Sequence, residues 1–354
     1  MSERVLMKGN EALAEAAIQA GCRHFFGYPI TPQTELSAYM AKRMPKIGGT
    51  FLQAESEVAA INMVLGAAAA GVRAMTSSSS PGISLKSEGI SYIAGSDLPC
   101  VIINVQRGGP GLGGIQPSQA DYWQATKALG HGDFQLIVYA PSTVQEMVTT
   151  LFLAFDKSDE YRVPAMILAD GMLGQMMEPV EFPENAEVTK VEKPWASNGH
   201  GGKRPHNVVN SLYLKPQDLE NHVVERFERY NKIKQNEVLV EEFMMDDAEI
   251  AVVSYGATSR IVRSAVKTAR EQGIKVGAIR PITLWPFPEK EIAAAAQKVK
   301  HFLCVEMSMG QMVEDVRLAV NGAKPVSFFG HTGGVIPTPD EVLKQIITLA
   351  GGAN

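Results

Sequence analysis

The sequence predicts an α/β protein with two parallel-sheet domains joined by a linker. A chain of 354 residues is long enough for about two domains. Residues 1–178 and 247–354 each alternate helix-patterned segments with short β-branched runs, which is typical of parallel sheets covered by helices. Residues 179–246 lose that alternation and contain five prolines, so we expect a linker there.

In the first domain, the pattern predicts a helix over 10–20 that ends at Gly21, and then a strand over 24–28 that stops at Pro29. A second helix is expected over 57–70, closed by Gly71. A strand over 73–76 follows, then a turn over 77–82 and a helix reaching Ser91. The apolar β-branched runs 99–105 and 165–169 are typical of strands buried in a parallel sheet.

In the linker, we expect an exposed loop at 198–202 and a surface helix over 217–237, because charged and bulky apolar residues alternate there at helical spacing. The second domain repeats the alternation of the first. Its expected elements are a strand at 250–255, a helix at 259–272, a strand at 276–280, a helix at 289–298 and a strand at 302–306.

The composition is that of an ordinary globular protein. Hydrophobic residues make up 45% of the chain and charged residues 20%, and the net charge is -5. Because there is no basic excess, we do not expect a nucleic-acid binder. The longest apolar run, 64–72, is too short to span a bilayer, and the first residues lack the apolar segment of a signal peptide. We therefore expect a cytoplasmic protein without a membrane partner.

The chain has three cysteines, Cys22, Cys100 and Cys304, and no CxxC pair. Structural zinc sites and iron–sulfur clusters need closely spaced cysteines. We therefore expect no metal site or cluster in this chain.

The segment Gly-Tyr-Pro-Ile-Thr-Pro at 27–32 lies where a predicted strand ends, which is where open α/β sheets bind ligands. The two prolines around Thr31 would hold its hydroxyl in a fixed place. The alternative is a rigid turn in which Thr31 caps a helix or Pro32 is its first residue.

Two carboxylates, Glu55 and Glu57, precede the alanine-rich helix. A capping role is one interpretation, since a helix N-terminus favours negative charge. Nearly every residue over 58–71 is apolar or small, which indicates burial on more than one face. A carboxylate at the start of so buried a helix needs a partner, so Glu57 is a candidate functional residue.

Arg107 opens a glycine-rich run at 107–114 that lacks both the phosphate-loop lysine and the dinucleotide spacing. A guanidinium at the carboxyl edge of a sheet suits the capture of a small carboxylate, and a surface ion pair is the alternative.

Asp170-Gly171 followed by Asn198 is similar to a motif that holds a magnesium diphosphate. Ala169 precedes it in place of glycine, and the proline-rich stretch 179–194 cannot form the helix between its two parts, so we set it aside.

Several motifs together resemble the α subunit of 2-oxoacid:ferredoxin oxidoreductases, over nearly the whole chain. They are Gly-Tyr-Pro-Ile-Thr-Pro at 27–32, Ala-Glu-Ser-Glu at 54–57, Thr-Ser-Ser-Ser-Ser-Pro-Gly at 76–82, Gln-Arg-Gly-Gly-Pro at 106–110 and Ile-Arg-Pro-Ile-Thr-Leu-Trp-Pro-Phe-Pro at 279–288. The resemblance implies a thiamine-diphosphate pyrimidine-binding module, followed by a domain similar to the transketolase C-terminal domain.

Within this family, the segments 54–64 and 114–121 look closest to the 3-methyl-2-oxobutanoate (2-ketoisovalerate) type, with the 2-oxoglutarate type as a near alternative. The implied reaction is oxidative decarboxylation of a branched-chain 2-oxoacid to acyl-CoA and CO2, with reduction of ferredoxin. The resemblance implies that Glu57 hydrogen-bonds the ring nitrogen of the aminopyrimidine. Thr31 and Arg107 would hold the substrate. The other implied cofactor-binding residues are Tyr28, Pro29, Ile30 and Ser80.

The resemblance also implies partners. A β subunit would hold Mg²⁺ and the diphosphate of the shared thiamine diphosphate, and an iron–sulfur or γ subunit would carry the [4Fe-4S] clusters. Coenzyme A would be the co-substrate. One alternative is a lipoamide-linked 2-oxoacid dehydrogenase component, which the segment 28–32 disfavours. The other is a catalytically silent scaffold subunit. In the second domain, Trp285, Glu306 and Gln311 could contact coenzyme A or a neighbouring subunit, but for Trp285 we expect a packing role.

Overall fold

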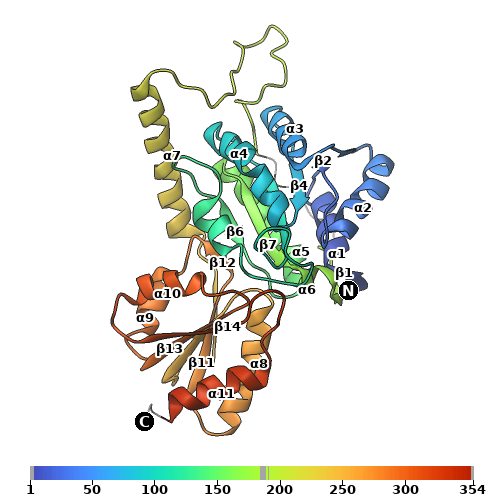
Figure 1. The fold of residues 1–354 in the computed structure, drawn as a ribbon. Helices are drawn as coiled ribbons and strands as arrows, with labels where there is room; N and C mark the ends of the chain where they lie inside the picture. Colours follow the sequence, from blue (N-terminus) through green and yellow to red (C-terminus); the bar gives the residue numbers. More distant parts are fainter. Residues whose placement is uncertain (1–3, 184–188, 190, 352–354) are drawn as a thin grey trace.

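The computed structural model describes residues 4–183, 189 and 191–351, so 184–188 and 190 of the expected linker lie outside the described residues. Its larger sheet has seven strands, parallel except at one edge (Figure 1). In spatial order they are β12 (Thr283–Trp285), β6 (Ile137–Tyr139), β7 (Ala165–Asp170), β5 (Val101–Gln106), β4 (Ala74–Ser78), β2 (His24–Gly27) and β3 (Thr50–Gln53).

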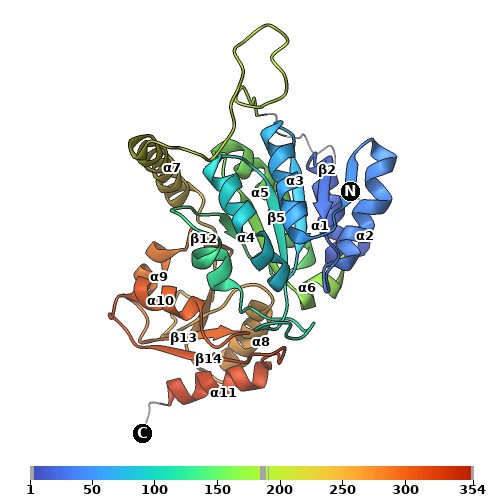
Figure 2. The same ribbon diagram turned by 45° about the horizontal axis from the view of Figure 1, so that its top comes forward.

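Helices cover both faces of this sheet (Figure 2). On one face α1 (Gly9–Gln19) packs against α2 (Thr34–Arg43) and α5 (Val144–Tyr161), and on the other face α3 (Glu57–Ala69) packs against α4 (Ser80–Gly95). All six residues of β5 are buried, as expected for a central parallel strand. A short antiparallel pair, β1 (Val5–Lys8) with β8 (Met177–Val180), lies beside α1, and α6 (Gly171–Gln175) follows β7.

The second sheet has five strands in the order β14 (Val326–Gly330), β13 (His301–Glu306), β10 (Ile250–Val253), β11 (Val276–Pro281) and β9 (Val240–Phe243). Only β9 runs antiparallel to its neighbour among these strands of the described chain. Two helix pairs pack within this half, α8 (Thr258–Glu271) with α11 (Pro339–Ala350), and α9 (Glu289–Ala295) with α10 (Met312–Val320). The predicted fold class, two α/β units with parallel sheets, is confirmed.

The helix expected on the surface of the linker is α7 (Pro216–Asn236), which is largely exposed, with Arg226, Tyr230 and Ile233 buried. Two strands cross the predicted division of the chain. β9 belongs to the linker range but joins the second sheet, and β12 belongs to the third range but joins the first. The division into domains at 1–178 and 247–354 with a linker at 179–246 stays a proposal, with β9 assigned to the second sheet and β12 to the first.

Two local expectations were wrong. The serine run is not a turn, because β4 continues to Ser78 and α4 begins at Ser80. The hydroxyl of Ser77 donates to buried Gln33 at 2.6 Å, which lets a polar residue lie inside the sheet. The helix after the 27–32 segment begins at Thr34, so Thr31 is not its cap and Pro32 is not its first residue.

Within the described residues, no helix combines the length and the apolar character needed to cross a bilayer.

Candidate functional site

The candidate residues gather at the carboxyl edge of four adjacent strands. The 27–32 segment follows β2, Glu57 follows β3, Ser80 follows β4 and Arg107 follows β5. Since the carboxyl ends of parallel strands meet at one edge, the sheet brings together side chains that are far apart in sequence.

Glu57 is the first residue of α3, and only 6% of it is exposed. The cap of this helix is Ser56, whose Oγ accepts a hydrogen bond from the Ala59 amide at 3.1 Å, so neither carboxylate is needed as the cap. Glu55, in contrast, is exposed. In the part of the chain that the structure describes, Glu57 forms no hydrogen bond and no ion pair.

Gly82 of α4 lets this carboxylate and the Ser78 hydroxyl approach the helix backbone closely. A Cβ atom there would lie 2.8 Å from Glu57 Oε1 and 2.1 Å from Ser78 Oγ. Ser78 Oγ and Ser79 Oγ are buried without a hydrogen-bond partner among the described residues. A buried acid and buried hydroxyls without protein partners are groups that can bond a polar ring such as an aminopyrimidine, which carries both donors and acceptors.

Arg107 is 7% exposed, and its guanidinium is held by backbone carbonyls. Nη1 donates to the Thr31 carbonyl at 3.0 Å and Nη2 to the Leu112 carbonyl at 3.2 Å, while Nε is buried without a partner among the described residues. The surface ion pair considered as an alternative is therefore wrong. The structure brings Arg107 and Thr31 together, as the proposed substrate site requires.

Thr31 itself is exposed and lines an open cavity of about 540 Å³. The rest of this cavity is formed by Pro32, Ile115, Gln116, Pro117, Gly171, Met172, Gln175, Met176 and Ile336. The segment before it is anchored by Gln33, which donates to the Tyr28 carbonyl at 3.2 Å. Tyr28 and Pro29 are exposed and Ile30 is half-buried, so all three are accessible to a partner molecule.

Ser80 uses its hydroxyl inside the protein. Its Oγ donates to Asp121 Oδ2 at 2.6 Å and accepts from the Arg107 amide at 3.0 Å. Asn104 also donates to Asp121 Oδ2, at 2.9 Å. Burial raises the pKa of the Asp121 carboxyl, while the hydrogen bonds from Ser80 and Asn104 lower it. The cofactor-binding role of Ser80 stays a prediction; what the structure shows is a hydroxyl that fixes the Arg107 backbone.

Sequence reasoning missed Gln33 and Asp121. The signal for Asp121 was the polar run 116–121 beside the glycine-rich segment, and for Gln33 a buried polar residue directly after Pro32.

A family model described as pyruvate flavodoxin/ferredoxin oxidoreductase, thiamine diphosphate-binding, matches residues 15–245. A second model, core domain II of pyruvate:ferredoxin oxidoreductase, matches residues 248–342. The chain belongs to the 2-oxoacid:ferredoxin oxidoreductase family. It is a subunit of an oxidoreductase with a thiamine-diphosphate-binding domain, and the predicted resemblance is confirmed.

Curated relatives of this 2-oxoacid:ferredoxin oxidoreductase subunit include the ketoisovalerate oxidoreductase subunit VorB of Methanothermobacter thermautotrophicus, 48% identical over 99% of both chains. The 2-oxoglutarate synthase subunit KorA of Methanothermobacter marburgensis is 39% identical, over 98% of this chain and 99% of that protein.

Among solved structures, the 2-oxoglutarate:ferredoxin oxidoreductase of Magnetococcus marinus matches with a TM-score of 0.85 and 27% identity. The match covers 98% of this chain, and the chain spans 65% of that longer one. A split-gene transketolase in an inactive tetramer matches with a TM-score of 0.61 and 13% identity, which shows the common fold alone.

Asp170 and Asn198 of the rejected diphosphate motif are engaged in separate places. Asp170 is fully buried and caps α6, accepting from the amides of Met172 at 2.8 Å and Leu173 at 3.1 Å. Burial raises its pKa to about 6. Asn198 lies in an exposed loop and accepts from Arg204 at 2.9 Å. The local structure gives each side chain a role that needs no diphosphate.

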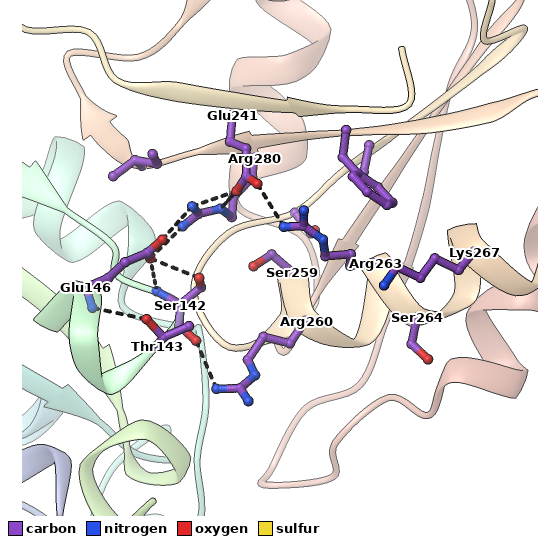
Figure 3. Close-up of a pocket in the computed structure, with 14 residues that line it drawn as sticks. Ser142, Thr143, Glu146, Glu241, Ser259, Arg260, Arg263, Ser264, Lys267 and Arg280 are labelled. Carbon is purple, nitrogen blue, oxygen red and sulfur yellow. Dashed lines mark hydrogen bonds and ion pairs between the residues drawn. The ribbon is translucent and has the colours of Figure 1, made fainter. Parts of the chain in front are cut away.

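A cavity of about 610 Å³ lies between the two halves of the oxidoreductase subunit, and Arg280 and Arg263 pair there with Glu146 and Glu241 (Figure 3). Arg280 of β11 donates to both oxygens of Glu146 on α5, each at 2.8 Å, and to Glu241 of β9 at 2.7 Å. Arg263 also binds Glu241, at 2.8 Å. Because Arg280 binds carboxylates from both halves, we interpret the cavity as part of an ion-pair contact between them.

The second-domain residues singled out earlier also contribute to contacts within the chain. Trp285 is 7% exposed and packs edge-on against Tyr230, with ring centroids 5.5 Å apart, in agreement with a packing role. Glu306 is fully buried and accepts from three amides at the start of α10. Gln311 donates to the Ala120 carbonyl at 2.8 Å and so ties α10 to the loop next to Asp121.

Proposed function

We propose that this chain is the α subunit of a thiamine-diphosphate-dependent 3-methyl-2-oxobutanoate:ferredoxin oxidoreductase. The enzyme would convert the branched-chain 2-oxoacid and coenzyme A to acyl-CoA and CO2 with reduction of ferredoxin. The observation that carries the proposal is the buried Glu57 carboxylate, which lies against Gly82 at the carboxyl edge of the sheet and has no hydrogen-bond partner among the described residues. The 48% identity to a ketoisovalerate oxidoreductase subunit supports the substrate.

Glu57 would act on the cofactor through one proton. Bound thiamine diphosphate supplies a ring that stabilises the carbanion left when a 2-oxoacid loses CO2. Because the Glu57 carboxylate has no protein partner among the described residues, it would be available to share a proton with a ring nitrogen of the cofactor. Burial helps here, since water would otherwise compete for the same hydrogen bond. Tyr28, Pro29, Ile30 and Ser80 would complete this chain's part of the cofactor site.

Thr31 and Arg107 would hold the 2-oxoacid. The Thr31 hydroxyl and the unpaired Nε–H of Arg107 are donors suited to the carboxylate or carbonyl of the substrate. The cavity beside Thr31 is lined in the described chain by uncharged residues, with Ile115, Met172 and Ile336 among them. That lining favours an apolar branched side chain over 2-oxoglutarate, whose second carboxylate needs a cation. The 39% identity to a 2-oxoglutarate synthase subunit keeps that substrate as the second candidate.

The site would be completed by other subunits in the cytoplasm. Four large side chains near Glu57 are exposed: Tyr28 by 36%, Leu52 by 40%, Val58 by 47% and Leu85 by 56%. Exposed apolar groups around a candidate site are typical of a surface that a protein partner covers. We propose that a β subunit carrying Mg²⁺ and the diphosphate site covers this face, and that iron–sulfur or γ subunits pass electrons to ferredoxin.

The test is Glu57→Gln in the complex assembled with its partner subunits. The amide keeps the size of the side chain but cannot exchange a proton, so we expect turnover to fall roughly 10²–10⁴-fold. Glu55→Gln is the matched control, because that side chain is exposed two residues away, and it should leave turnover unchanged. If Glu57→Gln kept full turnover, the chain would be a scaffold subunit and the proposal would fail.

A further inference from the structure

Lys86 is a lysine of α4 with no access to solvent, exposed by 0%. Its Nζ donates to Thr76 Oγ1 of β4 at 3.1 Å, and across the described residues it forms no other hydrogen bond and no ion pair. An ammonium group has three N–H donors, so two of them are left without a protein partner. Burying a charge in this state is strongly unfavourable unless another charge compensates it.

The compensating charge belongs to Glu57. In α4, Gly82 lies one turn before Lys86 on the same face of the helix, and Gly82 is the residue that faces Glu57 Oε1. The helices α3 and α4 pack side by side (Figure 2), and Gly89 allows close approach, since a Cβ there would lie 2.4 Å from Ile61. The Lys86 and Glu57 side chains therefore both lie between α3, α4 and β4.

Glu57 is the charge that acts on Lys86, although α4 also carries Glu88, which bonds Tyr92, and Asp121 bonds Ser80 at the start of α4. α3 contributes Glu57 alone, and the strands β4 (AMTSS) and β5 (VIINVQ) contain no ionisable side chain. Burial lowers the pKa of Lys86 to about 8, and the charge of Glu57 acts in the opposite direction. The two groups are thus coupled by charge without forming a direct ion pair.

Fold stability does not account for a lysine at this position. Methionine has a similar length and would fill the same space without a desolvation cost, and replacing buried ionic groups by well-packed apolar ones is often neutral or stabilising. A retained, incompletely paired buried charge beside a candidate catalytic acid is instead typical of a functional site.

We infer that Lys86 is a positioning residue for Glu57: its buried ammonium attracts the negative charge that forms on Glu57 when the shared proton moves to the ring nitrogen of the cofactor. This inference rests on the proposed function. The step moves one proton from Glu57 Oε1 to that nitrogen, and no electrons are transferred. Lys86 touches neither the substrate nor the cofactor and acts through Glu57.

A double-mutant cycle on the full chain without cofactor tests the coupling. In the Glu57→Gln background, Lys86→Met should raise the unfolding temperature, because it removes a buried charge. In the native background the change should be less favourable, because the attraction to Glu57 is lost as well. Equal changes in the two backgrounds would show that the charges do not interact, and would overturn the inference.

The second experiment measures proton exchange at the thiazolium C2 of the cofactor in D2O, using the assembled complex. We expect Lys86→Met to slow this exchange about tenfold or more and to lower kcat with little change in the KM for the 2-oxoacid. Lys267→Met, on the exposed face of α8, is the control and should leave both rates unchanged.

The same measurement separates two failures. If Glu57→Gln slows the exchange and Lys86→Met does not, the inference about Lys86 is wrong and the proposed function stands. If Glu57→Gln leaves the exchange unchanged, the role of Glu57 in the proposed function is wrong as well.

Discussion

Arg107 owes its position to residues that do not reach the open cavity. Asp121 binds the hydroxyl of Ser80, and that hydroxyl accepts a hydrogen bond from the Arg107 amide. Hydrogen bonds to a buried carboxylate are stronger than those between neutral groups. The Arg107 backbone is therefore held by Ser80, and its guanidinium is held by the Thr31 and Leu112 carbonyls.

Lys86 gives a pH dependence that is visible in the chain alone. Its pKa falls from 10.5 to about 8 on folding, so between these values the unfolded chain binds more protons than the folded one. Its contribution to the free energy of unfolding is therefore unfavourable below about pH 8 and improves as the pH rises toward 10.5, by on the order of 3 kcal/mol. Urea unfolding at several pH values should show this rise in the native chain.

Lys86→Met should flatten that part of the pH profile, and Lys267→Met should not. An unchanged slope in the Lys86 variant would mean that Lys86 titrates normally in the folded chain.

At the scale of elements, the ion-pair cluster around Arg280 joins β9 and β11 of the second sheet to α5 of the first half. Arg280→Met would leave Glu146 and Glu241 without their main partner, and we expect the chain to lose roughly 3 kcal/mol of unfolding free energy. Arg263→Met at the exposed rim of the same cavity is the control, with an expected loss under about 1 kcal/mol. Denaturant unfolding of both variants checks this, and equal losses would contradict it.

The sequence predicts elements well where one local rule decides them. The helix after Ser56 and the buried strand at 101–106 have strong apolar patterns and are found nearly as expected. The strand 283–285 could not be foreseen, because three residues carry no period and its partner β6 is more than a hundred residues earlier. The polar end of β4 at Ser78 was missed because its hydroxyl-bearing residues are stabilised by contacts from distant segments, such as the bond from Ser77 to Gln33.

For the site, the sequence predicted which residues lie near one another but not how each is bonded. Thr31 and Arg107 were each expected after a strand, and they meet across the end of β4, which lies between β2 and β5. Which hydroxyl is satisfied inside the protein depends on side chains from remote loops, as for Ser80 and Asp121. Lys86 was not singled out from the sequence, and its burial is what distinguishes it.

At the scale of the whole molecule, the uncharged cavity beside Thr31 predicts substrate preference. In the assembled complex we expect kcat/KM for 3-methyl-2-oxobutanoate to exceed that for 2-oxoglutarate at least about tenfold, because the described lining offers no cation to a second carboxylate. Steady-state assays with a viologen dye as acceptor, with pyruvate as the third substrate, measure the ratio. A higher kcat/KM for 2-oxoglutarate would assign the chain to the 2-oxoglutarate:ferredoxin oxidoreductase type.

The strand β12 ties the two halves together in a way that matters for anyone who wishes to divide this protein. A polypeptide ending at residue 246 would lack β12 and leave one side of β6 unpaired, and a bare strand edge recruits other chains. A separately produced C-terminal fragment would contain β12, including Trp285, without the strand β6 with which it pairs. Fusions, truncations and split versions of this subunit should therefore keep residues 137–139 and 283–285 on the same molecule.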